Sequence, residues 1–116
     1  MNMDQVFDSV LRHSKGYSMS SLWQSLGVEV SSERIGCQEQ VEIFLSLLGG
    51  LLQKGEIRLA LKGEFLEGDV DQLLQTLRAA WPNSKDELEA DMGLWFLVGA
   101  PAGIVWFTPD GQEIWT

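Results

Sequence analysis

The sequence has only one cysteine, Cys37, and one histidine, His13, among its 116 residues. A single cysteine excludes a disulfide within the chain and a zinc site built from cysteines. Eight lysines and arginines stand against 17 aspartates and glutamates, which leaves a formal net charge of −9. Because nucleic acids and anionic lipids are bound by basic surfaces, this acidity argues against both as ligands and permits a basic protein partner.

Long apolar runs are also missing. No stretch approaches the roughly 20 apolar residues of a membrane helix, and Met1–Asp4 lacks the cationic and apolar segments of a signal peptide. We therefore expect a cytoplasmic protein with no part in a membrane. With 45% hydrophobic and 22% charged residues the chain can bury a core, and its length suits a single domain over residues 1–116.

The first half of the sequence has the apolar spacing of amphipathic helices. Asp4 suits a first turn, where the helix dipole favours a negative charge, and Ser18 suits an N-cap. Gly49-Gly50 costs a helix roughly 1 kcal/mol per glycine relative to alanine, so we expect a neighbouring backbone to pack there. The predicted helices span about residues 2–14, Ser18 to Gly27, and about residues 33–54.

The second half mixes strand and helix signals. Residues 57–61 alternate with a period of two and precede the turn Lys62-Gly63-Glu64, which predicts a strand or hairpin. Asp69 with Gln72 forms a capping-box pattern for a helix that stops at Pro82, and Ser84 with Glu87 repeats the pattern for a short acidic helix. Strands are predicted at residues 94–98, 104–108 and 112–115.

These elements predict an α+β domain. Its order is N-terminal helices, one strand or hairpin, two further helices and a C-terminal antiparallel meander.

The sequence contains no catalytic or metal-binding motif. His13 lies near the end of a predicted helix, where a cation complements the dipole, and Cys37 lies on the apolar stripe of the third predicted helix. The carboxylates lack the spacing of a calcium loop, and Gly99–Gly103 suits a connector better than a phosphate-binding loop. We therefore expect no enzyme, no cofactor and no metal, with an enzyme that uses His13 or Cys37 as the alternative.

Acidic and aromatic residues gather in the same part of the chain. Four of the five tryptophans follow residue 80, and from residue 67 onward there are nine acidic residues against two basic ones. Protein interfaces use aromatic anchors in charged surroundings, so this half is the predicted partner-binding region. A solvated face without a partner is the alternative for residues 86–91. The candidate partner-binding residues are Asp71, Asp86, Glu87, Glu89, Asp91 and Trp115.

Several short motifs fall between residues 50 and 116: Gly55–Ala60, Gly63–Gly68, Trp81-Pro82, Leu94–Phe96 and Pro101–Trp106. Together they resemble a family of short acidic bacterial proteins of unknown function. The motifs are structural, so the resemblance assigns no site residue. Members of such families are often encoded beside contact-dependent or polymorphic toxins, so the resemblance implies an immunity protein.

Two functions follow as hypotheses. The first is an immunity or inhibitor protein that neutralises a basic toxin domain, such as a nuclease, by stoichiometric docking of its acidic surface. The alternative is a structural or regulatory interaction domain, for example a homodimer joined through the edge of the C-terminal sheet. Three helices followed by Lys54–Leu59 are also similar to a winged helix, but the glutamates of the third predicted helix would repel phosphate.

Overall fold

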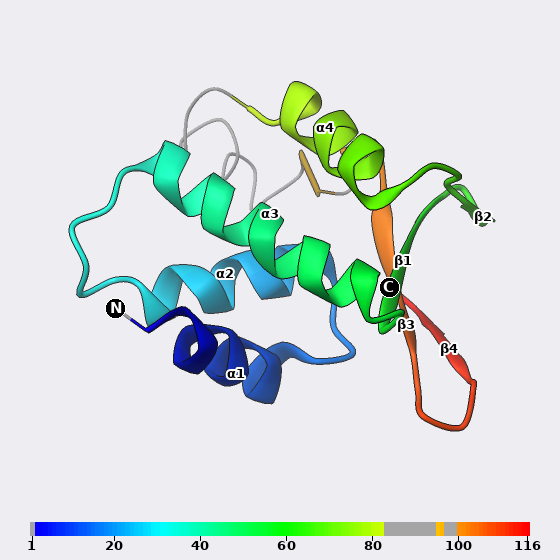
Figure 1. Ribbon diagram of the computed structural model, residues 1–116, viewed down its shortest axis with the longest axis horizontal. Coiled ribbons are helices and arrows are strands. Elements are labelled where there is room, and N and C mark those ends of the chain that lie inside the picture. Colours follow the sequence, from blue (N-terminus) through cyan, green and yellow to red (C-terminus); the bar gives the residue numbers. More distant parts are fainter. Residues whose placement is uncertain (1, 83–94, 97–99) are drawn as a thin grey trace.

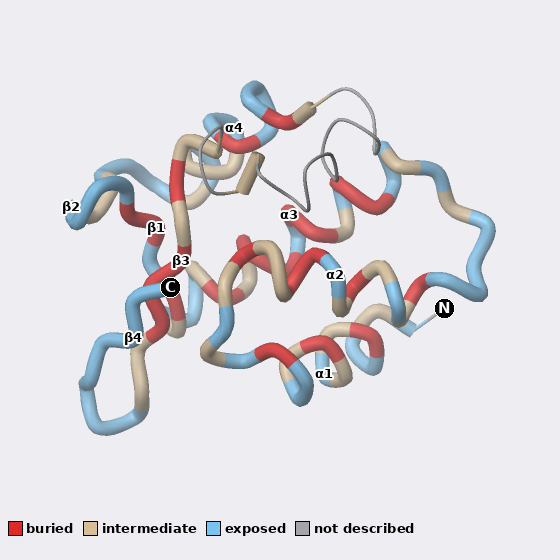
Figure 2. The backbone as a smooth tube through the Cα atoms, turned by 180° about the vertical axis from the view of Figure 1, so that it is seen from behind, coloured by how far each residue is buried: buried red, intermediate tan, exposed pale blue. Residues whose placement is uncertain are grey.

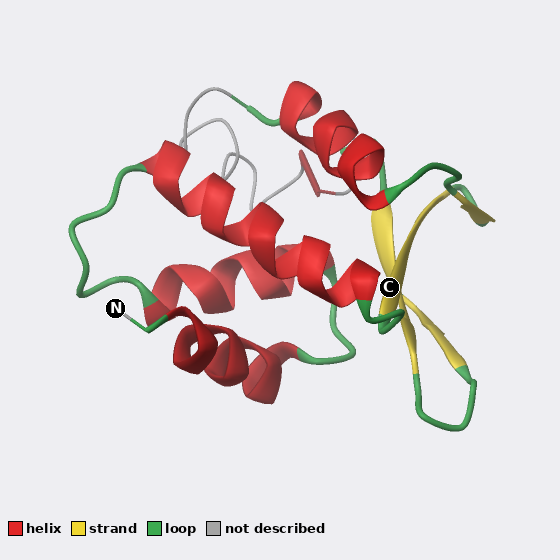
Figure 3. Ribbon diagram, viewed as in Figure 1, coloured by secondary structure: helices red, strands yellow, loops and turns green. Residues whose placement is uncertain are grey.

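Four helices and four strands make up the described part of the chain, which is residues 2–82, 95–96 and 100–116 of a computed structural model (Figures 1 and 3). This arrangement confirms the α+β class. Among the described residues, no helix has both the length and the apolar character needed to cross a membrane. The elements are α1 (Met3–Ser14), α2 (Met19–Glu29), α3 (Cys37–Gln53), β1 (Ile57–Leu61), β2 (Glu64–Phe65), α4 (Val70–Ala80), β3 (Gly103–Phe107) and β4 (Glu113–Trp115).

Helix ends follow the capping signals of the sequence. The Ser18 hydroxyl accepts the Ser21 amide at 3.3 Å and begins α2. Asp69 and Gln72 form the complete capping box of α4, in which each side chain accepts the backbone amide of the other residue, at 2.8 and 3.0 Å. These bonds satisfy amides that have no partner inside the helix, so they fix where α2 and α4 begin.

Two predicted helix boundaries are wrong. Helix α2 does not end at Gly27, because the Val30 amide still donates to the Leu26 carbonyl at 3.0 Å, which extends the helix to Glu29. Helix α3 begins at Cys37 rather than near residue 33. Gly36 has extended backbone and its carbonyl accepts the Gln40 amide, so Gly36 is the N-cap.

The glycine pair in α3 does not face a neighbouring backbone. A Cβ atom on Gly49 would lie 3.1 Å from Cδ1 of Leu74, which is a side chain of α4, and a Cβ on Gly50 would meet nothing within 4 Å. Gly49 therefore lets α4 approach α3. The two helices are also joined by a bidentate ion pair between Arg78 and Glu42, whose shortest N–O distance is 2.8 Å.

The predicted strand at residues 94–98 is described only at Trp95 and Phe96, which have helical backbone and lie outside the sheet. Their rings pack on Trp81, at centroid distances of 4.9 and 5.9 Å, and this packing against the helices outweighs the local strand preference. The other residues of that prediction, and the acidic helix predicted after Ser84, lie outside the described residues.

The four strands form one antiparallel sheet in the order β2-β1-β3-β4. Lys62 and Gly63 both have positive φ, 53° and 82°, which is the type I′ geometry of a two-residue hairpin loop and confirms the predicted turn. Strand β1 also pairs with β3, although β2, α4 and the residues after α4 lie between these two strands in the sequence. The sheet stands at the end of the helical layer opposite the N-terminus (Figure 1).

The main core lies between the helices and the near face of the sheet. Figure 2 shows buried residues along α2, α3, β1 and β3, whereas β4 and the α2–α3 connection are exposed. Trp106 of β3 is 2% exposed, and its indole N–H donates to the Tyr17 carbonyl at 2.8 Å. That bond ties the sheet to the connection between α1 and α2. The sheet side chains in this core are Ile57, Leu59, Ile104 and Trp106.

Candidate functional site

The face of the sheet that points away from the core is concave. Phe65 lies on β2 and Trp115 on β4, which are opposite edges of the sheet. Three strand spacings would separate these edges by about 14 Å in a flat sheet. The two ring centroids are nevertheless 5.1 Å apart. The sheet therefore curls, and β2 and β4 both extend to the side of β1 and β3 away from the helices (Figure 1).

Aromatic side chains fill this concavity. Phe107 lies 6.1 Å from Phe65, and the Arg58 guanidinium carbon lies 4.1 Å from the Phe65 ring centroid, within the range of a cation–π contact. Val105, which faces Arg58 on one side and Trp115 on the other, is buried. We define the aromatic face as Arg58, Phe65, Phe107 and Trp115.

Trp115 is the one exposed aromatic ring of the aromatic face, in which Arg58 is also exposed and Phe65 and Phe107 are half-buried. Its side chain is 46% exposed, and its indole N–H donates to Oε1 of Glu113 at 3.0 Å. Glu64, Glu67 and Asp110 are exposed residues of the neighbouring strand and loops. A cationic side chain placed on this indole would therefore meet a ring face and a carboxylate together, which is an arrangement that binds arginine and lysine.

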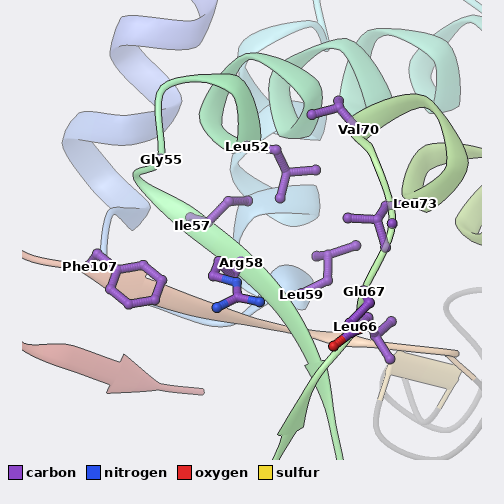
Figure 4. Close-up of a pocket in the computed structure, with 11 residues that line it drawn as sticks. Leu52, Gly55, Ile57, Arg58, Leu59, Leu66, Glu67, Val70, Leu73 and Phe107 are labelled. Carbon is purple, nitrogen blue, oxygen red and sulfur yellow. The ribbon is translucent and has the colours of Figure 1, made fainter.

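A cavity of about 620 Å³ adjoins the aromatic face (Figure 4). It opens between the end of α3, the first half of β1 and the start of α4, and Arg58 and Phe107 line both the cavity and the aromatic face. Seven of its lining side chains are aliphatic or aromatic, which makes it an apolar cleft with charge at its margin. Its lining residues are Leu52, Gly55, Ile57, Arg58, Leu59, Leu66, Glu67, Gly68, Val70, Leu73 and Phe107.

The structure separates the two sequence-predicted site residues that it describes. Asp71 is exposed in the first turn of α4, where its charge complements the helix dipole. Trp115 lies on β4, where its ring packs on Phe65 and its N–H donates to Glu113, so its contacts do not involve Asp71. The other four candidates, Asp86, Glu87, Glu89 and Asp91, lie outside the described residues.

The two candidate catalytic side chains also lie apart in the fold. His13 is exposed near the end of α1, and its Nδ1 lies 2.8 Å from the Ser9 carbonyl oxygen. Cys37 is the first residue of α3 and is half-buried against the main core. The shallow cavity beside His13 is lined by residues of α1 and α2 and the turn between them, and Cys37 is not among them. Within the described ranges, no group of three or more histidine, cysteine or acidic side chains is placed to hold a metal ion.

Sequence reasoning missed Phe65, Phe107 and Arg58. A signal for two of them was present in the period-two alternation of the strands. It places Arg58 on the other face of β1 from Ile57 and Leu59. It likewise places Phe107 on the other face of β3 from Trp106 and Ile104. The alternation does not reveal that the two sheet edges meet, since this depends on the curl of the whole sheet. Phe65 sits on a two-residue strand, which is too short for a periodic signal.

The fold has a counterpart among solved structures. An uncharacterized protein conserved in bacteria, from Neisseria meningitidis, is 27% identical to this chain and superimposes with a TM-score of 0.79. The match covers 97% of this chain and 85% of the other. No curated protein matches the sequence.

The family match falls on the half of the chain that contains the site. The model of the family described as "Protein of unknown function, DUF596" matches residues 52–116, which include all four strands and α4. The whole aromatic face lies inside this region. The sequence-based resemblance to a bacterial family of unknown function is thereby confirmed, and the chain belongs to the DUF596 family.

Proposed function

We propose that this protein is a non-catalytic binding protein that docks its aromatic face on a cationic surface of a protein partner. The observation that carries the proposal is Trp115, which remains 46% exposed although it is stacked on Phe65 and hydrogen-bonded to Glu113. An ordered aromatic side chain costs little conformational entropy on binding, and such residues dominate the energetics of interfaces.

The net charge of the chain indicates that the partner is a cationic protein. A net charge of −9 speeds the approach of a cationic protein and disfavours nucleic acids and anionic membranes. The specific form that we propose is an immunity protein that neutralises a basic toxin domain, such as a nuclease, in the cytoplasm. The frequent occurrence of such bacterial families beside toxin genes motivates this form. It is also supported by the charge of the chain from residue 67 onward, where nine acidic residues stand against two basic ones.

The experiment is a calorimetric titration with a toxin-like domain encoded next to the gene for this chain. The dissociation constant is measured at several salt concentrations, because an electrostatic interface weakens as salt screens it. We expect Trp115→Ala to weaken binding by about 30-fold or more, which is the effect of losing an aromatic hot spot. Asp71→Lys is expected to weaken it less.

Asp4→Lys is the matched control for Asp71→Lys. Both residues are exposed aspartates in the first turn of a helix, and both changes alter the net charge equally. Equal weakening by the two would show a general charge effect without a role for α4. Affinity that is the same at low and high salt, or unchanged by Trp115→Ala, would contradict the proposal.

A homodimer is the second candidate, and the free edge of β4 favours it. Within the described residues β4 pairs only with β3, and its Ile114 and Trp115 are both exposed. Unpaired edge strands readily join another chain. Light scattering distinguishes the candidates: a mass that doubles with protein concentration in the wild type, and not in Ile114→Lys, supports self-association.

A further inference from the structure

Two side chains of opposite charge lie at the margin of the apolar cleft. Arg58 comes from β1 and Glu67 from the segment between β2 and α4, and both residues are exposed. Figure 4 shows the guanidinium of Arg58 and the carboxylate of Glu67 turned toward one another across the cleft. Among the described residues that line the cleft, these two are the only charged ones.

Neither charge is neutralised by an ion pair within the described part of the chain, where the ion pairs join other residues. The guanidinium carbon of Arg58 lies 4.1 Å from the centroid of the Phe65 ring. Stacking of this kind covers the flat face of a guanidinium, whereas the N–H groups point outward in its plane, in the geometry that binds a carboxylate with two hydrogen bonds. Arg58 is therefore held in position with its donors available to a ligand.

The lining beside these two charges is apolar. Ile57 and Leu59 are buried and form the floor of the cleft, and Leu66, Val70 and Leu73 are half-buried along its other side. The volume of about 620 Å³ lies in the range of cavities that bind small molecules. Such cavities combine a mostly apolar lining with a few polar groups that orient the ligand. The cleft therefore suits a small molecule with a large apolar group and a charged end.

The two charges select a ligand that carries both signs. A free α-amino acid has a carboxylate, an ammonium group and its side chain on one carbon atom, so it can meet Arg58, Glu67 and the apolar lining together. Its net charge is zero, so the charge of −9 on the chain does not repel it, as it would repel a simple carboxylate. A simple amine would complement Glu67 but would be repelled by Arg58.

We propose that the apolar cleft is a binding site for a free α-amino acid with a large apolar side chain. Arg58 binds the α-carboxylate, Glu67 binds the α-ammonium group, and the side chain of the ligand packs on the floor of the cleft. The complementary pair of charges at the margin of an apolar cavity carries this inference. It goes beyond the proposed function, because the ligand is a small molecule and its binding requires no protein partner.

The test titrates L-phenylalanine into the full chain, in which the methyl groups of leucine and valine are labelled with ¹³C. We expect saturable binding with a dissociation constant below about 1 mM. The ring of the bound ligand is expected to shift the methyl resonances of Leu66, Val70 and Leu73 most, because these residues line the cleft.

Three analogues of L-phenylalanine each lack one of the groups that the site recognises. The analogue 3-phenylpropanoate lacks the ammonium group, 2-phenylethylamine lacks the carboxylate, and L-alanine lacks the large apolar side chain. We expect each to bind at least about tenfold more weakly than L-phenylalanine, since each leaves a charged group of the protein or the apolar floor without its partner.

Glu67→Gln and Glu64→Gln form one matched pair of variants. Both glutamates are exposed and both changes alter the net charge equally, but only Glu67 lines the cleft. We expect Glu67→Gln to weaken binding of L-phenylalanine by about fivefold to tenfold and Glu64→Gln by less than about twofold. Binding of 3-phenylpropanoate, which has no ammonium group, is expected not to weaken in Glu67→Gln.

Arg58→Gln and Arg34→Gln form the second pair. Both arginines are exposed, and Arg34 lies in the α2–α3 connection, outside the lining of the cleft. We expect Arg58→Gln to weaken binding of both L-phenylalanine and 3-phenylpropanoate by about tenfold, because both carry a carboxylate. Arg34→Gln is expected to change neither by more than about twofold.

Three results would overturn the amino-acid site: equal weakening by the two glutamate variants, binding of 3-phenylpropanoate as tight as that of L-phenylalanine, or no saturable binding of L-phenylalanine, L-leucine or L-tryptophan up to about 10 mM. The comparison of analogues uses the wild-type chain, so it decides the question even if a variant fails to fold. Failure here is also distinct from failure of the proposed function. Amino-acid binding is measured on the chain alone, whereas docking of a toxin domain is measured through Trp115→Ala.

Discussion

Trp106 and Trp115 occupy neighbouring strands of one sheet and have opposite surroundings. Trp106 points into the main core, is 2% exposed, and donates its N–H to the Tyr17 carbonyl. Trp115 lies on the concave face, is 46% exposed, and donates to Glu113 in its own strand. Helices cover the first ring, whereas the second is held by the curl of the sheet. Burial alone accounts for Trp106, and an exposed, ordered Trp115 invites a functional explanation.

Truncation of the two tryptophans is the strongest test of this comparison. Trp106→Ala is expected to lower the free energy of unfolding by about 3–5 kcal/mol, because it leaves a cavity and an unpaired Tyr17 carbonyl. Urea denaturation followed by circular dichroism measures the change. A loss of less than about 1 kcal/mol would mean that neighbouring side chains fill the space left by Trp106. The proposed difference between the buried and the concave face of the sheet would then be contradicted.

Trp115→Ala is expected to cost much less stability. It removes a half-exposed ring and one aromatic contact with Phe65, so the free energy of unfolding should fall by about 1 kcal/mol. The same denaturation experiment applies, with Trp115→Phe as a variant that keeps the stacking. If Trp115→Ala destabilises the chain as strongly as Trp106→Ala, the concave face is a second core and its role as a binding surface loses support.

The two glycines of α3 offer the same comparison with a smaller expected effect on stability, because Gly49 faces α4 and Gly50 faces open space. Gly50→Ala is expected to stabilise the chain by about 0.5–1 kcal/mol, since it improves helix propensity and its Cβ enters open space. Gly49→Ala is expected to gain less or to destabilise, because its Cβ would press on Leu74 at 3.1 Å. Thermal unfolding of both variants provides the measurement. Equal gains would show that α4 moves freely over α3.

Local signals in the sequence predicted much of the fold. Ser18 and the Asp69–Gln72 capping box set helix starts through hydrogen bonds to nearby amides, and Lys62-Gly63 sets the hairpin through its own backbone preference. The predictions are wrong where contacts with residues distant in the sequence determine the local structure. Trp95 and Phe96 have the composition of a strand, but contact with Trp81 places them in a helical turn.

The candidate site was less predictable than the fold. Trp115 was selected from the sequence as an aromatic anchor, but its partner Phe65 was not, because 50 positions separate them and only the curl of the sheet unites them. The apolar cleft had no signal in the sequence, because the residues that line it come from α3, β1, α4 and β3 and meet only in the folded chain. The role of Asp86, Glu87, Glu89 and Asp91 stays a prediction.

The bond from Trp106 to the Tyr17 carbonyl also constrains how the chain matures during translation. Helices α1 and α2 leave the ribosome well before β3, because Trp106 lies 89 positions beyond Tyr17 in the sequence. Until β3 is made, the Trp106 side chain cannot contact the α1–α2 connection, so this long-range contact forms only after α3 and α4 have been synthesised.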